Sequence, residues 1–314
     1  MTNLKIETIK KNDFFFDESY QEYQSDYYKT NFIFKEIIIK DCKEEYHIPF
    51  TLHNKNSTKY ISFLGEPLKM YVDKNLSAKK VFGIWKKFLK KTQIKDPKFN
   101  FFFKENEKNF TVEDLKKLKI AQTFKKQEIE LDKKISEIFN LFKPNLKNEI
   151  RKIKKNKSFI VKIYDHTNYV DKKILDMKKM HYFVAKKKTR SDKCWDLNEK
   201  FIKKKKGFLV EILYKKKPIS YSFFANDINK SIYFSSVTDR NYFKLAGVNH
   251  LSLWKAIIYS KYKKIKKLEL GITKYCYNRD LDKVTKKDEN IAFFKSRFNG
   301  KEDFFISIDE KSKI

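Results

Sequence analysis

The order of hydrophobic and polar positions divides the chain into two series of short strands and amphipathic helices. Runs rich in β-branched and aromatic residues predict strands, and apolar residues at helical spacing predict helices. In the first half the pattern predicts strands over residues 32–40, 46–53, 60–64, 98–103 and 120–131, and helices over 77–89 and from 111 onward. In the second half it predicts strands over 159–164, 207–214, 218–225, 231–237, 267–270 and 303–308, and helices over 145–156, 169–183, 192–204, 248–262 and 289–297.

This alternation predicts an α/β (α+β) fold with mostly antiparallel sheets flanked by helices. The three strands between 207 and 237 are joined by short polar links that are typical of hairpins. The pattern restarts after Pro144, a residue that suits the first turn of a basic helix. We therefore expect two domains, residues 1–142 and 143–314.

The composition excludes several classes of protein. Of the 314 residues, 41% are apolar and 16% aromatic, which is too much for a disordered chain. No apolar run approaches the ~20 residues of a membrane span, and the amino terminus has no apolar signal segment. The three cysteines, Cys42, Cys194 and Cys276, are far apart and predict neither a disulfide framework nor a metal site. We expect a cytoplasmic protein, with peripheral contact at the inner membrane face as an alternative.

The formal net charge of +32 has two interpretations. A basic surface can bind nucleic acid or anionic lipid. However, only five of the 72 basic residues are arginine, the residue that suits phosphate recognition best. The surplus of Lys, Asn, Ile, Phe and Tyr together is typical of adenine- and thymine-rich codons. Most of the charge then reflects genomic background, and each of the few arginines is more informative than an average lysine.

Several short sequence motifs occur in an order that resembles FemAB-like acyltransferases of the GNAT superfamily. The clearest is the closing Phe-Lys-x-x-Phe-x-Gly of residues 294–300. The others are Lys188-Thr-Arg-Ser-Asp192 followed by Trp195, Tyr233-Phe-Ser-Ser-Val237 with Arg240, His250-Leu-Ser-Leu-Trp-Lys-Ala256, Leu268-Glu-Leu-Gly271, Ile48-Pro-Phe-Thr-Leu52, and Phe63-Leu-Gly-Glu-Pro67 with Tyr71.

The resemblance implies two tandem GNAT-like domains with a cleft between them, the second of them FemAB-like. It further implies transfer of an acyl or aminoacyl group to the amine of a sugar or peptide precursor in cell-envelope or polysaccharide synthesis. Relatives use aminoacyl-tRNA to extend peptidoglycan precursors, or act in surface-polysaccharide and lipid-linked sugar pathways.

The donor stays open between acyl-CoA and aminoacyl-tRNA, and no tightly bound cofactor is expected. Coenzyme A-dependent GNAT enzymes hold the pyrophosphate in a glycine-rich loop, whereas residues 240–248 contain a single glycine. Several tRNA-using relatives carry a long helical hairpin, for which the sequence shows no pair of helices long enough. A tRNA-dependent peptidoglycan aminoacyltransferase and a non-catalytic polyanion-binding protein are the alternative functions. The basic cluster at 143–157 is either a solvated helix face or a docking patch for tRNA or anionic lipid.

Two residues are predicted to be catalytic. The resemblance implies that Lys295 reaches the donor near its reacting ester, where an ammonium offsets negative charge, and that Phe294 aims it or contacts the substrate. His250 lies at the start of a helix, where a neutral imidazole could accept the proton of the amine or simply cap the helix.

Other residues are predicted to bind substrate. Arg240 and Arg279 are candidates for a donor or acceptor phosphate, and Arg190 with Trp195 for the acceptor. Tyr233 could stack a sugar or base at the cleft. For each arginine a structural salt bridge is the alternative. Glu269 is either a base or the polar side of a half-buried strand.

Overall fold

The computed structural model describes residues 3–7, 17–28, 33–41, 44–55, 58–62, 83, 90, 98–103, 120–242, 245, 247–275 and 284–309. Arg279 and the predicted helix from 111 onward lie outside these residues, as does the predicted helix over 77–89 apart from Gly83.

The first part of the chain contains one of the two sheets and the beginning of the other. Its elements are β1 (Asn3–Glu7), α1 (Glu18–Tyr28), β2 (Ile33–Asp41), β3 (Glu44–Lys55), β4 (Thr58–Ser62), β5 (Lys98–Phe103), β6 (Ile120–Glu130) and α4 (Ile135–Leu141). The elements that follow are α5 (Pro144–Lys155), β7 (Phe159–Tyr164), α6 (Lys173–Ala185), α7 (Asp192–Lys203), β8 (Gly207–Tyr214), β9 (Lys217–Asn226), β10 (Lys230–Thr238), α8 (Val248–Tyr262), β11 (Lys267–Tyr275), α9 (Lys286–Ser296) and β12 (Lys301–Asp309).

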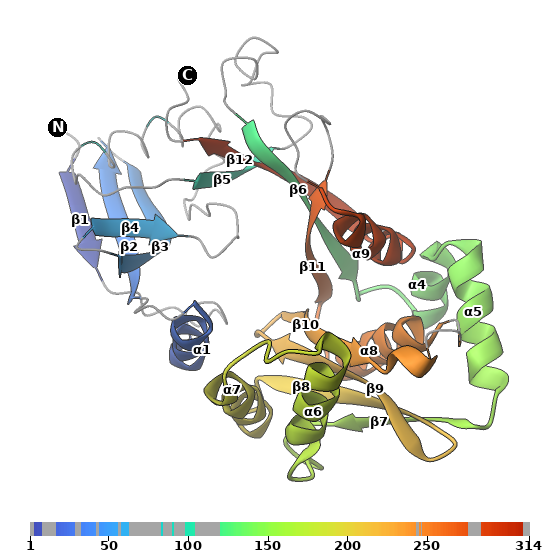
Figure 1. Ribbon diagram of the computed structural model, residues 1–314. Helices are drawn as coiled ribbons and strands as arrows, with labels where there is room; N and C mark the ends of the chain where they lie inside the picture. The colour runs from blue at the N-terminus through green and yellow to red at the C-terminus, as the bar shows by residue number, and fades with distance from the viewer. Residues whose placement is uncertain are drawn as a thin grey trace.

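One sheet of eight strands unites both halves of the sequence (Figure 1). Its order is β5-β12-β6-β11-β10-β9-β8-β7, so β12 lies between two strands of the first half and is antiparallel to both. Within the described strands only the β10–β11 pair is parallel. A second, antiparallel sheet has the order β1-β2-β3-β4. The prediction of an α/β fold with mostly antiparallel sheets is confirmed, whereas the division at 142/143 stays a prediction.

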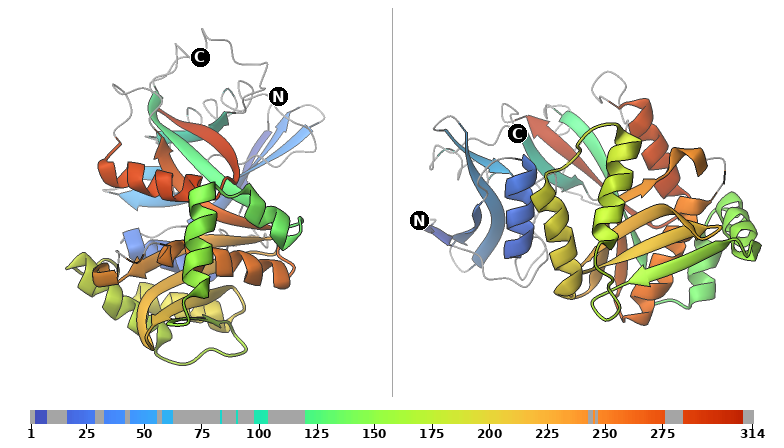
Figure 2. Two further views of the ribbon diagram at one scale, coloured as in Figure 1. Left: turned by 90° about the vertical axis from the view of Figure 1, so that its right-hand side faces the viewer. Right: turned by 60° about the horizontal axis from the view of Figure 1, so that its bottom comes forward.

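Helices cover both faces of strands β8 to β10 (Figures 1 and 2). Alternate side chains of β8 point to opposite faces, and the residues from Gly207 to Leu213 are all buried. Phe208, Val210 and Ile212 join a cluster with α4, α5 and α8 on one face. Leu209 joins a cluster with α1, α6 and α7 on the other face. We call these the α8 face and the α6–α7 face.

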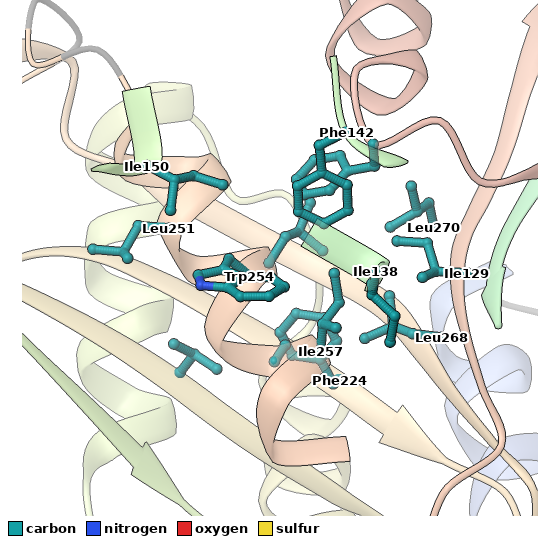
Figure 3. Packing of buried hydrophobic residues seen from close by; sticks show 14 of the residues in the cluster. Ile129, Ile138, Phe142, Ile150, Phe224, Leu251, Trp254, Ile257, Leu268 and Leu270 are labelled. Atoms are coloured by element: carbon teal, nitrogen blue, oxygen red, sulfur yellow. The ribbon is translucent and has the colours of Figure 1, made fainter. Parts of the chain in front are cut away.

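Trp254 of α8 lies in the middle of the α8-face core (Figure 3). Its ring centroid is 5.5 Å from that of Phe142, nearly perpendicular to it, and 4.9 Å from that of Phe139. The aliphatic side chains Ile138, Ile257 and Leu268 fill the space beneath it. Such a contiguous aromatic and aliphatic cluster fixes α4 and α8 against the sheet, because truncating a buried aromatic residue costs about 3–5 kcal/mol.

Several elements differ from the sequence prediction, which lacked β1 and α1. The short helix α4 was not predicted. Helix α6 begins at Lys173 rather than at 169, since Lys172 has a left-handed backbone (φ 77°) and ends the preceding turn. Strand β11 continues to Tyr275, although the pattern predicts its end at Leu270. Gly271 interrupts the apolar pattern of the strand. In the structure it has a φ of +76° and lies in a bulge, after which the strand continues.

The turn between α9 and β12 approaches β6 closely. A Cβ on Gly300 would lie 2.5 Å from the carbonyl oxygen of Glu128, so only glycine fits without a shift of the backbone. In the amide orientation that satisfies both of its polar groups, Gln127 donates to the Lys295 carbonyl (2.8 Å) and accepts from the Gly300 N–H (3.1 Å). This turn therefore fixes the end of α9 on the sheet.

We expect Gly300→Ala to destabilise the protein by about 1–3 kcal/mol, because the new methyl group overlaps a backbone atom that cannot move freely. Thermal unfolding of the purified variant measures the effect. Gly83→Ala is the control, since a Cβ at Gly83 would meet nothing within 4 Å. An unchanged melting temperature for Gly300→Ala would show that the turn yields and does not hold α9.

Candidate active site

The candidate site lies where the two parallel strands of the large sheet separate. Three pairs join β10 and β11, from Lys230 with Lys267 to Ile232 with Glu269. Beyond these pairs β10 continues along β9, and β11 continues along β6. Backbone N–H and C=O groups on the two diverging edges thus lose a neighbouring strand, and such groups need other hydrogen-bond partners. We call the point beyond Ile232 and Glu269, where β10 and β11 separate, the strand opening.

A bulge in β11 marks the same point. The register of β11 with β6 jumps from Glu269 to Ile272. Within this bulge, a Cβ on Gly271 would lie 3.4 Å from the Lys295 Nζ and 3.8 Å from the Tyr233 carbonyl oxygen. Both distances are ordinary van der Waals contacts, so the positive φ of Gly271, rather than a lack of space, favours glycine at this position.

Lys295 reaches this bulge from α9. The helix begins at Thr285, whose hydroxyl accepts from the Asp288 N–H in a capping box. The Lys295 side chain is buried, and its Nζ donates to the Ile272 carbonyl oxygen at 3.3 Å. Burial lowers the pKa of Lys295 to about 8, although the negative charge of Glu269 opposes this shift. At pH 7 the group is mostly an ammonium ion, yet it can lose its proton slightly above neutrality.

Glu269 supplies the negative charge beneath the site. It is 1% exposed, and its Oε2 lies 2.7 Å from the Lys230 Nζ and 3.0 Å from the Lys126 Nζ. Burial on its own raises the pKa of Glu269, but the two ammonium groups outweigh burial and the pKa is lowered. Glu269 is therefore an ionised partner of buried lysines and is poorly suited to act as a base.

Aromatic side chains of α9 hold the helix against α8 and α4. The ring of Phe294 stacks on the ring of His250, with centroids 4.6 Å apart. Phe298 is buried, 5.1 Å from Phe142 in edge-to-face geometry. These contacts explain the spacing Phe-Lys-x-x-Phe-x-Gly: the aromatic residues pack, the glycine approaches β6, and Lys295 faces the strand opening.

His250 belongs to an ion-pair cluster that joins three helices. Its Nδ1 lies 2.9 Å from the Glu149 Oε2 of α5, and the Glu149 Oε1 lies 2.6 Å from the Arg297 Nη2, just after α9. Burial lowers the pKa of His250 to about 4, with a further contribution from Arg297, while Glu149 opposes the shift. In the neutral ring that results, Nδ1–H donates to Glu149. Nε2 is a buried acceptor without a hydrogen-bond partner among the described residues.

Arg190 and Trp195 lie elsewhere, on the α6–α7 face. The Arg190 Nε donates to the Tyr23 hydroxyl at 3.0 Å, and its guanidinium lies 5.2 Å from the centroid of the Trp195 ring. The Trp195 Nε1 donates to the Tyr182 hydroxyl at 3.2 Å, and the indole is 1% exposed. These contacts attach α1 to α7, and the structure does not bring either residue together with Lys295.

The other predicted binding residues have separate positions. Tyr233 lies at the opening through its backbone, whereas its hydroxyl donates to Ser236 and burial raises its pKa. Arg240 is exposed in the short turn Arg240–Tyr242 after β10, while the neighbouring Asp239 accepts from the Asn241 N–H. Among the residues that the structure describes, no group of three His, Cys, Asp or Glu side chains could hold a metal ion.

Sequence reasoning missed the charged residues that support the site. Glu149, Lys126 and Lys230 are far apart in the sequence from the groups they contact, and no local pattern marks them. Arg297 had one signal, the scarcity of arginine. Gly271 was part of the motif Leu268-Glu-Leu-Gly271, but its role depends on a bulge that the sequence does not show.

The strand order, the parallel pair that separates partway and the long helix between its strands make up a fold that is also found in the solved structures of FemX and of a tandem GNAT protein. Among solved structures, FemX shares it with a TM-score of 0.60 at 11% identity, covering 92% of this chain and 90% of that one. L-PGS from Bacillus licheniformis has a TM-score of 0.53 at 8% identity over 94% and 88% of the two chains. A tandem GNAT protein from the clavulanic acid biosynthesis pathway has a TM-score of 0.52 at 6% identity over 99% and 100%. No family model and no curated protein matches the sequence.

We expect His250 to titrate near pH 4, well below the 6.5 of an ordinary histidine. Because the unfolded chain binds this proton first, the stability that the neutral ring contributes is complete above pH 6.5 and is lost as the pH falls toward 4. NMR titration of the imidazole and acid unfolding of His250→Gln measure these effects. A folded-state pKa at or above 6.5 would contradict the buried, neutral ring.

Proposed function

We propose that this protein is an acyltransferase, which moves an acyl or aminoacyl group from an activated donor to the amine of a sugar or peptide precursor in cell-envelope or polysaccharide synthesis. The observation that carries the proposal is the buried ammonium of Lys295, beside Gly271 at the point where β10 and β11 separate. The fold shared with FemX and with a tandem GNAT protein supports it.

The proposed reaction needs a held carbonyl and an uncharged amine. The amine nitrogen attacks the acyl carbon, a C–N bond forms, and the bond from carbon to the donor's oxygen or sulfur breaks. In this proposal, main-chain groups at the strand opening hold the donor, and the Lys295 ammonium lies beside the oxygen that gains negative charge. One well-placed donor of this kind contributes ~3–4 kcal/mol to the transition state, and positioning of the reactants contributes ~7–11 kcal/mol.

His250 is the proposed proton acceptor. Its imidazole is neutral at physiological pH, and its Nε2 carries an unused lone pair. The same ring also supports α9, because it stacks on Phe294, the residue before Lys295. His250 therefore has both a chemical and a positioning role in the proposal.

The names of similar structures suggest the class of donor and product. One is the C-terminal domain of a putative lysylphosphatidylglycerol synthetase from Agrobacterium fabrum, and the tandem GNAT protein is described without AcCoA.

A membrane-spanning helix is not found among the described residues, in which no helix is both long and apolar enough.

We expect Lys295→Ala to lower turnover by at least about tenfold while the protein stays folded, because it removes the charge that offsets the developing oxyanion. Wild-type activity should also decline above pH about 8, where Lys295 loses its proton. The measurement is mass spectrometry of amine-bearing nucleotide sugars and peptide precursors incubated with acyl-CoA or aminoacyl-tRNA.

Two variants complete this experiment. Lys295→Met preserves packing without the charge and should resemble Lys295→Ala, whereas Lys287→Ala removes an exposed lysine of the same helix and should have no effect. Unchanged turnover in both Lys295 variants would remove this residue from the mechanism. Binding of heparin and nucleic acids without acylation of any amine tested would favour the non-catalytic alternative.

A second candidate, the use of aminoacyl-tRNA as donor, is favoured by α5. The only acidic residue of this helix, Glu149, faces Arg297 and His250. Lys143 precedes the helix, and its N–H donates to the Arg297 carbonyl oxygen. The basic surface consequently borders the end of α9, close to Lys295 in sequence. Its exposed or half-buried basic residues are Lys143, Lys147, Arg151, Lys152, Lys154, Lys155 and Lys157.

We expect the triple variant Lys152→Gln/Lys154→Gln/Lys155→Gln to bind tRNA more weakly and with a shallower salt dependence, because fewer counterions are released. Filter binding at several salt concentrations measures both quantities. Identical slopes for wild type and variant would exclude α5 from tRNA binding, without affecting the role of Lys295.

A further inference from the structure

Three apolar side chains protrude at one end of the large sheet. Val170 in the loop before α6 is 53% exposed, Ile228 in the β9–β10 hairpin is 69% exposed, and Tyr262 at the end of α8 is 80% exposed. Each lies on a different segment of the chain. None of them contributes appreciably to the core.

Contacts between segments place all three at the same end. The loop that contains Val170 begins at Asp165, which accepts from the Tyr259 hydroxyl and pairs with the Lys263 Nζ at 2.9 Å. The end of α7 and the residues after α8 both bond to the β9–β10 hairpin. These bonds are Asn226 N–H to the Lys206 carbonyl (2.8 Å) and Lys266 N–H to the Asn229 carbonyl (3.0 Å).

Isoleucine is an unusual residue at the tip of a hairpin turn, where Ile228 lies. Tight hairpin turns select Gly, Asn, Asp or Ser, which satisfy local hydrogen bonds or tolerate unusual dihedral angles. Asp227 does so here, since its carboxylate accepts from the Ile228 N–H. Ile228 itself leaves an aliphatic side chain in water, which gains nothing for folding. A local rule that is broken without benefit to the fold points to a function.

Lysines surround these side chains. Two are ion-paired, Lys203 with Asp171 and Lys263 with Asp165. Five more lysines have no acidic side chain within 4 Å in the described ranges: Lys172, Lys204, Lys205, Lys264 and Lys266. The exposed lysines of this end are Lys172, Lys203, Lys204, Lys205, Lys263, Lys264 and Lys266. We call them, with Val170, Ile228 and Tyr262, the lysine-rich end.

We propose that the lysine-rich end binds the surface of a membrane that contains anionic lipid. Lysines are drawn to the negative headgroups, and the protruding tyrosine and aliphatic side chains enter the interface between headgroups and acyl chains. A second copy of this chain is a poor partner, because like charges would oppose each other. Nucleic acid is less suitable, since the end contains no arginine and its apolar tips would remain in water.

The contact would leave the candidate site accessible. Strands β10 and β11 are paired at the lysine-rich end, from Lys230 and Lys267 onward, and they separate toward their other ends. The strand opening thus points away from the bound membrane. A protein attached in this way would take its substrates from the aqueous side.

Sedimentation with vesicles tests the proposal on the full chain. We expect binding to phosphatidylcholine vesicles that contain phosphatidylglycerol and not to phosphatidylcholine alone. Lys204→Gln/Lys205→Gln/Lys264→Gln should weaken binding on the order of tenfold to a hundredfold. Ile228→Asn/Tyr262→Ser should still bind at low salt but lose the part of the binding that resists high salt, because that part depends on apolar insertion.

Matched variants elsewhere on the surface serve as controls. Lys215→Gln/Lys216→Gln/Lys217→Gln removes the same charge from the exposed β8–β9 turn at the other end of the sheet, and Phe183→Ser removes a side chain that is 67% exposed on α6. Both should bind vesicles as the wild type does. The proposal is wrong if a control weakens binding as much as its counterpart, or if neutral vesicles bind equally well. It is also wrong if the variants of the lysine-rich end lose affinity for tRNA and not for vesicles.

Discussion

A buried positive charge is the constraint on which the rest of the site depends. An ammonium group out of water is costly unless nearby groups compensate for it. Lys295 has a carbonyl oxygen as hydrogen-bond acceptor and the field of Glu269, which two further lysines keep ionised. Gly271, in a backbone conformation that favours glycine, lies next to the ammonium. An apolar side chain of similar size would pack there at lower cost, and perturbed buried charges of this kind cluster at functional sites.

The position of that charge depends on helix contacts made outside the sheet. Glu149 bridges His250 and Arg297, so that α5, α8 and the end of α9 are held by one carboxylate. Stacking of Phe294 on His250 adds a second, apolar restraint. Because α9 is held at several points, rotation of the helix that would withdraw Lys295 from the strand opening must break more than one contact.

Local patterns predicted most of the fold, because the relevant elements carry their own signals. Strands β8 to β10 are apolar runs separated by short polar links, and α8 is a longer, mainly apolar run of the length of a buried helix. The motif at 294–300 pointed to Lys295 as a candidate, and the structure places this lysine buried beside β11. By contrast, the insertion of β12 between β5 and β6 and the ion pairs of Glu149 and Glu269 join residues far apart in sequence. A window of neighbouring residues contains no trace of such pairs, so only the structure could reveal them.

The place of β12 in the sheet has a consequence for biosynthesis. Its two neighbours, β5 and β6, are translated long before it, and until β12 arrives each presents an open edge of main-chain hydrogen-bonding groups. The large sheet cannot be completed until β12 has been translated. We infer that the early strands need shielding on the ribosome, for instance by a chaperone, and that premature termination before β12 would yield an aggregation-prone product.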